Sequence, residues 1–302
     1  MSPKLSQIGE FGLIKHIERE IGSLKSVIKG IGDDTAVIPY TAGKGKRLLL
    51  TTDMLTEGVH FTRKMPAKSI GHKAMAGNIS DIAAMGGMPK YALVSLGVSP
   101  GISLRYIQEI YQGMKIVARE YGCQIVGGDT IKSEKLIINI FLVGEVKTRD
   151  VVLRSGAKKG DQIFVTGPLG NSYRSKHHLT FQPRIKESQY LVKHYKPSAM
   201  IDCSDGLAAD LGHILNASGV GAFIYEDQIP RRGKASLNAA LHDGEDFELI
   251  FTLSAKEAKK LSQKKRFQFF HIGEITEKKR KFQLVNRKGK SKPLLKRGFV
   301  HF

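Results

Sequence analysis

The chain has 302 residues, of which 41% are hydrophobic and 25% charged, and a net charge of +20. That length can bury a sizeable core, plausibly in two domains. No apolar run approaches the ~20 residues that span a bilayer, and residues 1–20 lack the apolar core of a secretory signal, so we expect a soluble, cytoplasmic protein. Two cysteines, Cys123 and Cys203, exclude a disulfide framework and fit a reducing compartment.

The first half of the chain shows helical and strand patterns in alternation. Helical periodicity predicts helices over residues 5–21 and 103–121, the second with Ser103 as its N-cap. Apolar runs rich in β-branched residues predict four strands. These strands are expected at 47–53, 91–99, 123–129 and 136–146.

The second half repeats this alternation, so we expect an α/β or α+β fold. Its predicted strands fall at 160–167, 199–203, 221–227, 246–253 and 267–275, and its helices at 184–196, 205–218 and 255–264. A polar stretch with Gly156 and Gly160 separates the two halves. We therefore divide the chain into residues 1–148 and 149–302.

Acidic residues gather in turns at the ends of five apolar elements, accompanied by hydroxyls and glycines. In one of these segments Asp81 is accompanied by the amide of Asn78, three residues earlier, so the two share one face of a helix. The other four turns carry Asp33 and Asp34; Thr51, Thr52 and Asp53; Gly127, Gly128 and Asp129; and Asp202, Ser204 and Asp205.

This set of oxygen ligands suits Mg²⁺ better than zinc or copper. Proteins hold Mg²⁺ through a few carboxylates together with substrate phosphates, so the pattern predicts several ions that carry a polyphosphate. Each turn alone has an ordinary structural explanation; Ser204 or Asp205, for example, could cap a helix. The coincidence of five turns carries the prediction.

Other catalytic signatures are absent from the sequence. There is no GxxxxGK[ST], GxSxG or HExxH motif, and GIGDDT lacks the third glycine of a dinucleotide fingerprint. Cys203 could be a nucleophile, but a small buried strand residue is the better interpretation. His60 follows an acidic turn and is equally compatible with a structural role and with substrate contact.

The excess of positive charge belongs to the C-terminal region. Residues 254–302 hold 16 Lys and Arg against 3 acids, whereas residues 1–253 hold 32 against 25. Basic and aromatic residues alternate there, as on an RNA-binding face. No zinc-finger spacing or RNA-binding consensus supports that role, so we expect a solvated surface and no nucleic-acid partner.

Eight motifs, in chain order, resemble those of the thiamine-monophosphate kinases, a family related to aminoimidazole ribonucleotide synthetase and selenophosphate synthetase. They are GIGDDTAVI, TTDMLTEGVHF, NISDIAAMGG, IVGGDT, LRSGAKKGD, FVTGPLG, IDCSDGLAADLGHI and GEDFELIFT. The resemblance implies a two-domain fold like that of aminoimidazole ribonucleotide synthetase. Its N-terminal half binds ATP and Mg²⁺ and pairs its sheet with that of a second subunit in a homodimer, and its C-terminal α/β sandwich completes the site.

The resemblance also implies the reaction and the site residues. The reaction is ATP-dependent phosphorylation of thiamine monophosphate to thiamine diphosphate by direct in-line transfer, with several Mg²⁺ ions. Matched by motif position, the implied metal ligands are Asp34, Thr51, Thr52, Asp53, Asp81, Asp129, Asp202 and Asp205. The implied ATP contacts are Tyr111, Gly128, Asp129, Arg154 and Ser204; the substrate contacts are His60, Glu245 and Phe299; and Asp53, Asp129 and Arg154 are the catalytic residues.

This chemistry needs little more than positioning and neutralisation of charge. The nucleophile is an oxygen of the substrate's own phosphate, which is ionised at neutral pH, so no general base is required. Compact segments at 170–183 and 230–243, and Asp243 where a glycine is common, leave the choice of acceptor open. The alternatives are another ATP-dependent activity of the superfamily and a non-catalytic RNA-binding or scaffold protein.

Overall fold

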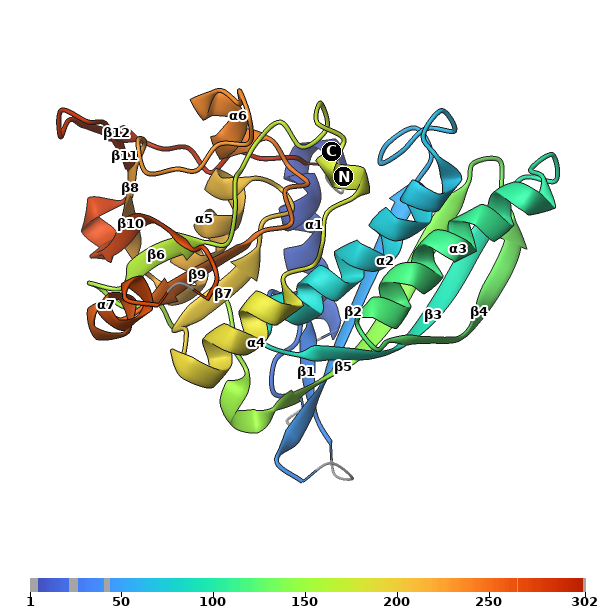
Figure 1. The fold of residues 1–302 in the computed structure, drawn as a ribbon, viewed down its shortest axis with the longest axis horizontal. Coiled ribbons are helices and arrows are strands. Elements are labelled where there is room, and N and C mark those ends of the chain that lie inside the picture. The colour runs from blue at the N-terminus through green and yellow to red at the C-terminus, as the bar shows by residue number, and fades with distance from the viewer. Residues whose placement is uncertain (1–4, 22–26, 41–43, 265, 301–302) are drawn as a thin grey trace.

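The first half of the chain forms a five-stranded sheet with the order β1-β2-β5-β3-β4 (Figure 1). The structure, a computed structural model, describes residues 5–21, 27–40, 44–264 and 266–300. The strands are β1 (Ala36–Pro39), β2 (Lys46–Thr56), β3 (Met88–Val98), β4 (Gln124–Lys132) and β5 (Ile137–Lys147). β3 and β4 run parallel, and the other neighbouring pairs are antiparallel.

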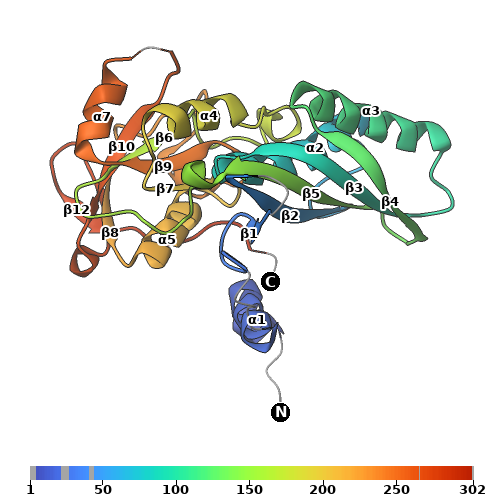
Figure 2. The same ribbon diagram turned by 90° about the horizontal axis from the view of Figure 1, so that it is seen from below.

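Two helices, α2 (Ala67–Ala84) and α3 (Leu104–Glu120), cover one face of this sheet (Figure 2). Alternate β5 side chains, Ile138 and Ile140 among them, are fully buried in the core on that side. The two helices approach closely at glycines: a Cβ on Gly71 would lie 1.9 Å from the carbonyl oxygen of Ile110 in α3. The alternation of buried and exposed residues thus fixes which face of the sheet the helices cover.

The opposite face of the first sheet carries exposed apolar side chains. Met54, Tyr91, Leu93 and Ile131 are between 41% and 60% exposed, and in β3 the exposed Tyr91 and Leu93 alternate with buried residues. In the part of the chain that the structure describes, no helix covers β3 and β4 on this side of the sheet (Figure 2). Such a contiguous apolar surface is a usual mark of an interaction site.

The second half forms a seven-stranded sheet with the order β12-β11-β8-β10-β6-β9-β7. Its strands are β6 (Gln162–Val165), β7 (Ala199–Asp202), β8 (Gly221–Tyr225), β9 (Leu249–Leu253), β10 (Phe270–Thr276), β11 (Phe282–Val285) and β12 (Ser291–Pro293). Its helices are α4 (Ile185–His194), α5 (Leu207–Ser218), α6 (Leu237–His242) and α7 (Ala255–Ser262).

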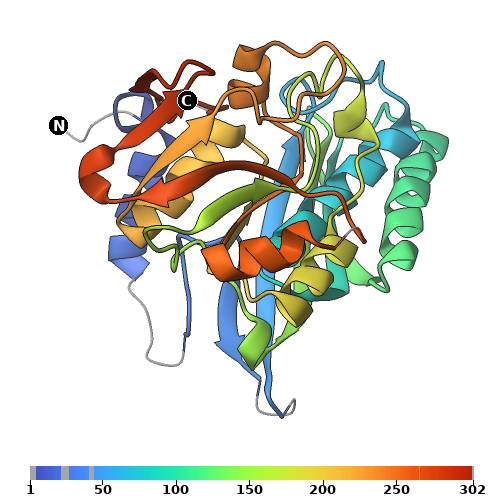
Figure 3. The ribbon, with the colours of Figure 1, turned by 60° about the vertical axis from the view of Figure 1, so that its left-hand side comes forward.

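The second sheet lies between two layers of helices (Figure 3). Phe164 and Phe251 stack on the face that α4 and α7 cover, and this core continues into that of the first half. Ile163 and Ile250 point to the other face and pack with α5 and α6 in a separate core. β9 is buried on both faces, which explains why four of the five residues in its sequence LIFTL are apolar.

The mixed α/β class and the sandwich expected of the second half are confirmed, and several element boundaries differ. α5 begins at Leu207, not 205. α6, β11 and β12 have no counterpart in the sequence prediction, because they are only six, four and three residues long. The division at residue 148 into two functional halves stays a prediction.

The first helix, α1 (Leu5–Ile21), lies apart from both sheets (Figure 2). It is interrupted at Gly9, whose φ of +66° a residue with a side chain rarely adopts. It contacts α5 through Phe11, whose ring centroid lies 5.0 Å from that of His213. Among the described helices, none is long and apolar enough to cross a membrane.

Candidate active site

A cavity of about 600 Å³ opens between the two halves of the molecule. Its walls come from the end of β2, from α2, from the turn between β7 and α5, and from the 243–247 loop. Eight of the residues predicted for the site line it: Asp53, His60, Asp81, Asp202, Ser204, Asp205, Glu245 and Phe299. The fold therefore brings together residues that are up to 246 positions apart in the sequence.

Three carboxylates form the acidic end of the site. Asp34, Asp81 and Asp202 each offer an oxygen, and these oxygens all lie within 4.8 Å of one another. Asp34 precedes β1, Asp81 lies in the last turns of α2, and Asp202 ends β7. One oxygen of Asp34, Oδ2, is buried without a hydrogen-bond partner. A buried anionic cluster with an unsatisfied oxygen and hard oxygen donors fits Mg²⁺.

Hydroxyl and amide groups orient these carboxylates. The Thr51 hydroxyl donates a hydrogen bond to Asp81 Oδ2 at 2.6 Å, and the Ser80 hydroxyl donates one to Asp202 Oδ2 at 2.7 Å. Asn78 accepts a hydrogen bond from the backbone N–H of Asp53 at 3.2 Å. Asp53 Oδ2 faces Gly77 of α2, where an added Cβ would lie 3.5 Å away. Small and polar residues on α2 thus leave room for the carboxylates that β2 and β7 carry.

Crowding of like charges alters the protonation of the cluster. Burial, followed by repulsion from Asp34, raises the pKa of Asp202 to about 8. The pKa of Asp53 is also raised, by loss of solvation in the cavity wall and then by Asp34, although the residue is more exposed than Asp202. The pKa of Asp81 is well above its ordinary value because of burial and then repulsion from Asp53 and Asp202. These four carboxylates repel each other unless a proton or a cation neutralises them. Bound divalent cations supply that neutralisation without protons.

Arg154 closes one side of the acidic end. Its guanidinium donates to Asp34 Oδ1 at 2.8 Å, and its backbone N–H donates to Asp33 Oδ1 at 3.1 Å. The sequence indicates no more than an acidic turn at Asp33; its pKa is raised to about 6 by burial and then by Asp34. Two neighbouring carboxylates thus hold one arginine beside the cluster.

The turn between Asp202 and α5 corrects one structural expectation. Neither Ser204 nor Asp205 caps the helix; the N-cap is Gly206, which has no side chain to do so. Instead the carboxylate of Asp210, one turn into the helix, accepts hydrogen bonds from the backbone N–H groups of Asp205 and Gly206, each at 3.0 Å. Because Asp210 serves the helix end, Ser204 and Asp205 remain at the cavity wall.

The other end of the cavity is built around a buried lysine. Lys73 of α2 is 2% exposed, and its ammonium donates to the carbonyl oxygen of His60 at 2.8 Å and to the Glu245 carboxylate. Burial lowers the pKa of Lys73, and the charge of Glu245 opposes that shift. His60 and Glu245, both predicted to contact substrate, are therefore joined through one cation.

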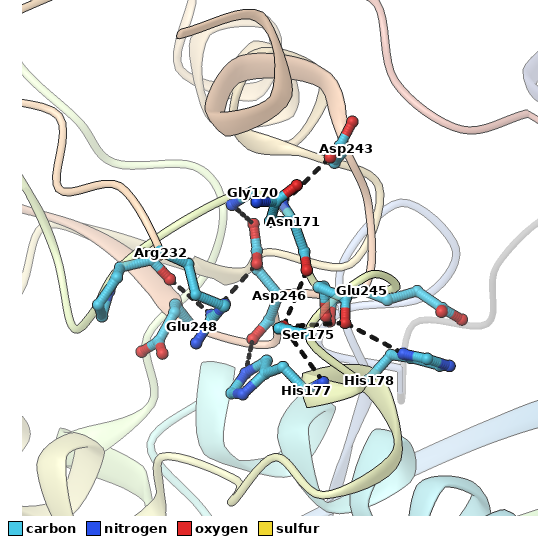
Figure 4. A network of polar contacts seen from close by, with 12 residues as sticks. Gly170, Asn171, Ser175, His177, His178, Arg232, Asp243, Glu245, Asp246 and Glu248 are labelled. Carbon is cyan, nitrogen blue, oxygen red and sulfur yellow. Dashed lines mark hydrogen bonds and ion pairs between the residues drawn. The ribbon is translucent and has the colours of Figure 1, made fainter. Parts of the chain in front are cut away.

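A polar network fixes the loop that carries Glu245 (Figure 4). Asp246 Oδ2 accepts from the backbone N–H of Gly170 at 2.7 Å, and Arg232 donates to Asp246 Oδ1 at 3.2 Å. Asp243 Oδ2 accepts from the backbone N–H of Asn171 at 3.1 Å, so this residue tethers the turn. Glu245 has a φ of +64°, a strained conformation for a non-glycine residue. Its carboxylate points away from the network (Figure 4).

Seven predicted residues do not line the cavity; Asp34, Thr51 and Arg154 belong to the acidic cluster or bond to it, and the other four lie elsewhere. Thr52 lies on the opposite face of β2 from Thr51 and donates to Asn139 Oδ1 at 3.1 Å. Gly128 and Asp129 lie on the exposed edge strand β4, where Asp129 pairs in register with Ser95. Tyr111 packs half-buried on α3. Within the described chain, the predicted ligands are thus divided between the two faces of the first sheet.

The sequence prediction missed several residues that line the cavity. Lys73 shares a helix face with Gly77 and Asp81 at intervals of four, a spacing that could have revealed it. Tyr173 and Arg174, from the compact segment after β6, gave no such signal. Cys203 is fully buried and its thiol pKa is raised by burial, which fits its interpretation as a structural residue.

The molecule thus combines a sheet covered on one face, an α/β sandwich and, between them, a cavity with an acidic cluster at one end and a buried lysine at the other. The sequence matches the family of AIR synthase related proteins, with the N-terminal domain over residues 32–146 and the C-terminal domain over residues 157–285. The chain is therefore a two-domain AIR synthase related protein.

Individual relatives narrow the class. The chain is 39% identical to the thiamine-monophosphate kinase of Aquifex aeolicus (82% of this chain, 87% of that one) and 36% identical to that of Bacillus subtilis (97% and 99%). The solved structure of AaThiL complexed with AMPPCP and TMP matches with a TM-score of 0.87 at 35% identity and covers 100% of both chains. The chain belongs to the thiamine-monophosphate kinase family.

Proposed function

We propose that this protein transfers the γ-phosphoryl group of ATP to the phosphate of thiamine monophosphate and releases ADP and thiamine diphosphate. A bond forms between an acceptor phosphate oxygen and the γ-phosphorus, while the bond to the β-phosphate oxygen breaks and its electron pair leaves with ADP. The main structural support for this proposal is the cluster of Asp34, Asp81 and Asp202 at one end of a cavity large enough for a substrate. The relatives' names and the AaThiL complex with AMPPCP and TMP support the same reaction.

Mg²⁺ fits the acidic end, and we assign Asp34, Asp53, Asp81 and Asp202 as the residues that hold it. When bound, Mg²⁺ neutralises the phosphate charges and draws the two anionic substrates together. Asp205 and Thr51, which supports Asp81, belong to the same ligand set. Arg154 is placed by Asp33 and Asp34 to stabilise negative charge that develops on the transferring group.

The opposite end of the cavity is the proposed acceptor site. His60 and Glu245 are joined there by Lys73, and Phe299 is held at the wall by a hydrogen bond from its backbone N–H to the carbonyl oxygen of Asp205 at 3.1 Å. The Glu245 carboxylate suits a cationic heterocycle, and an aromatic ring such as Phe299 can pack on its face. In this arrangement the anionic phosphate would face the metal ions and the cationic ring would face Glu245. These positions match the two charges of thiamine monophosphate.

We further propose that the protein is a homodimer joined through the uncovered face of the first sheet. The exposed apolar side chains on that face, Tyr91 and Leu93 among them, would be removed from water by a second copy. Thr52, Gly128 and Asp129 lie on that face or on its edge strand, so a second subunit would enclose them as well. This arrangement accounts for predicted ligands that the chain alone leaves outside its cavity.

Product analysis tests the proposed reaction. Purified protein with Mg²⁺, ATP and thiamine monophosphate should yield thiamine diphosphate and ADP in equal amounts, and omission of Mg²⁺ should abolish both products. Asp53→Asn keeps the size of the side chain but removes the charge, so turnover should fall by roughly a hundredfold or more while the melting temperature is kept or raised. Near-normal turnover of Asp53→Asn at saturating Mg²⁺ would refute the metal assignment.

The same assay separates the alternatives. ADP formed without thiamine diphosphate would retain the nucleotide site and indicate a different acceptor within the superfamily. Neither product, together with RNA affinity that survives physiological salt, would favour the non-catalytic alternative.

A further inference from the structure

A second cavity, of about 750 Å³, lies where the first sheet meets the end of α4. It is distinct from the candidate active site: Lys46, on its wall, precedes Asp53 in β2 by seven residues, a rise of roughly 23 Å along a strand. The wall is formed by the start of β2, the start of β3, the end of β5 with the following turn, and the turn after α4. Both halves of the molecule therefore contribute to it.

Positive charge dominates this basic cavity. The residues that line it include two acids, Glu145 and Asp150, and six cations: Lys46, Lys90, Lys147, Arg149, Lys193 and Lys196. Both acids are already paired, Glu145 with Lys46 at 2.7 Å and Asp150 with Arg149 at 3.6 Å. The other four lysines have no carboxylate within 4.0 Å in the described part of the chain.

The backbone places these lysines together despite their mutual repulsion. Lys46 and Lys147 are directly opposite in the antiparallel pair of β2 and β5, an arrangement that destabilises a sheet. Lys90 lies at an irregularity of β3, between Pro89 and Tyr91, that shifts its register against β5. Lys196 has a φ of +51° in the turn after α4. Four separate segments thus converge on one concave positive surface, which attracts anions.

The shape and chemistry of the lining select the kind of anion. Among the described residues that line the cavity, none is aromatic, so it lacks the platforms on which nucleic-acid bases stack. Flexible ammonium groups are suited to compact phosphate charges. We propose that the basic cavity binds a small inorganic or organic polyphosphate, of the diphosphate or triphosphate type, outside the catalytic centre.

Calorimetric titration of the full-length protein with pyrophosphate in the presence of a chelator tests this proposal. Without divalent cations the acidic cluster repels the anion, so saturable one-to-one binding reports the basic cavity. Lys90→Gln with Lys193→Gln should weaken binding by roughly tenfold or more, because two charge-assisted contacts are lost. The matched control is Lys288→Gln with Lys290→Gln, which removes the same charge from the exposed turn between β11 and β12 and should leave affinity unchanged.

Lysine labelling gives a second measurement that does not depend on variants. Pyrophosphate should protect Lys90, Lys193 and Lys196 of the wild-type protein from acetylation, as read by mass spectrometry, and leave Lys288 unprotected. Binding that requires Mg²⁺, equal loss in both variant pairs, or equal labelling with and without pyrophosphate would overturn the proposal. Tighter binding of a single-stranded RNA that the cavity variant abolishes would also overturn it, in favour of a nucleic-acid site.

Discussion

At the scale of single residues, the most informative side chain belongs to none of the sequence motifs. Lys73 is buried, yet its ammonium is satisfied on two sides, by a carbonyl and a carboxylate. A buried lysine is tolerated only with such partners, because an unpaired charge in the interior is very costly. Since the partners belong to His60 and Glu245, Lys73 is a positioning residue for the acceptor end of the cavity.

Replacing Lys73 should therefore change the KM for one substrate much more than the KM for the other. Lys73→Met frees Glu245 from its partner, and a lost charged hydrogen bond is worth about 1.5–3 kcal/mol. We expect the KM for thiamine monophosphate to rise roughly tenfold or more, while the KM for ATP changes little. Steady-state kinetics with each substrate varied in turn checks this expectation. Lys68→Met, an exposed lysine on the same helix, is the control; equal rises in both KM values would contradict the positioning role.

His213 predicts a pH dependence of stability. Burial, together with the positive charges of Arg154 and Lys296, lowers its pKa to about 4, whereas an unfolded histidine has a pKa near 6.5. The unfolded state therefore binds more protons between these values, and the free energy of unfolding falls as pH decreases. Between about pH 7.5 and about pH 5, wild type should lose about 2 kcal/mol more than His213→Gln. Urea unfolding at both pH values measures the difference, and parallel losses would show that His213 is not responsible.

At the scale of elements, the contact between α2 and α3 depends on glycine. A Cβ on Gly113 would lie 1.9 Å from the carbonyl oxygen of Lys68, a distance that forces the helices apart. Gly113→Ala should therefore lower the free energy of unfolding by about 1–3 kcal/mol, despite the better helix propensity of alanine. Gly101→Ala, where nothing lies within 4 Å of the added Cβ, should be near neutral. Thermal or urea unfolding distinguishes the two, and equal stability of both variants would refute the close-packing argument.

The elements that the sequence predicted are those with strong local patterns. The 3.6-residue period of α3 and the apolar run of β5 specify their structures almost without tertiary help. β11 could not be found in this way, because it has only four residues and one of its two partners, β8, lies some 60 residues earlier. α6, with six residues, is too short for a periodic signal.

The site was predictable in part for the same reason. Carboxylates at element ends carry a chemical signature that needs no coordinates, and Asp34, Asp81 and Asp202 do converge. Strand alternation alone would have placed Thr51 and Thr52 on opposite faces of β2. The partnership of Lys73 with Glu245 spans 172 residues and depends on the strained 243–247 loop, so no local pattern encodes it.

At the scale of the whole molecule, the apolar outer face of the first sheet predicts self-association. Wild type should sediment as a dimer at micromolar concentration, and Leu93→Glu should sediment as a monomer because it places a charge in the middle of the buried surface. Leu295→Glu, which changes an exposed leucine in the C-terminal segment, should remain dimeric. A wild type that is monomeric at every concentration would contradict the proposed interface.

The walls of the active-site cavity include Glu10 of α1 and Phe299, so nearly the whole chain separates its first contributor from its last. During synthesis on the ribosome, the five strands of the first sheet can pair and pack against α2 and α3 once β5 has emerged, because these elements all lie within residues 36–147. The core beneath them is completed only later, when residues of the second half such as Leu191 and Phe251 join it. The wall of the cavity cannot be complete until residue 299 has left the exit tunnel. A nascent chain that stalls before that point would lack the part of the wall that Phe299 forms. If Phe299 contacts the acceptor as proposed, we expect activity to appear only after synthesis has passed residue 299.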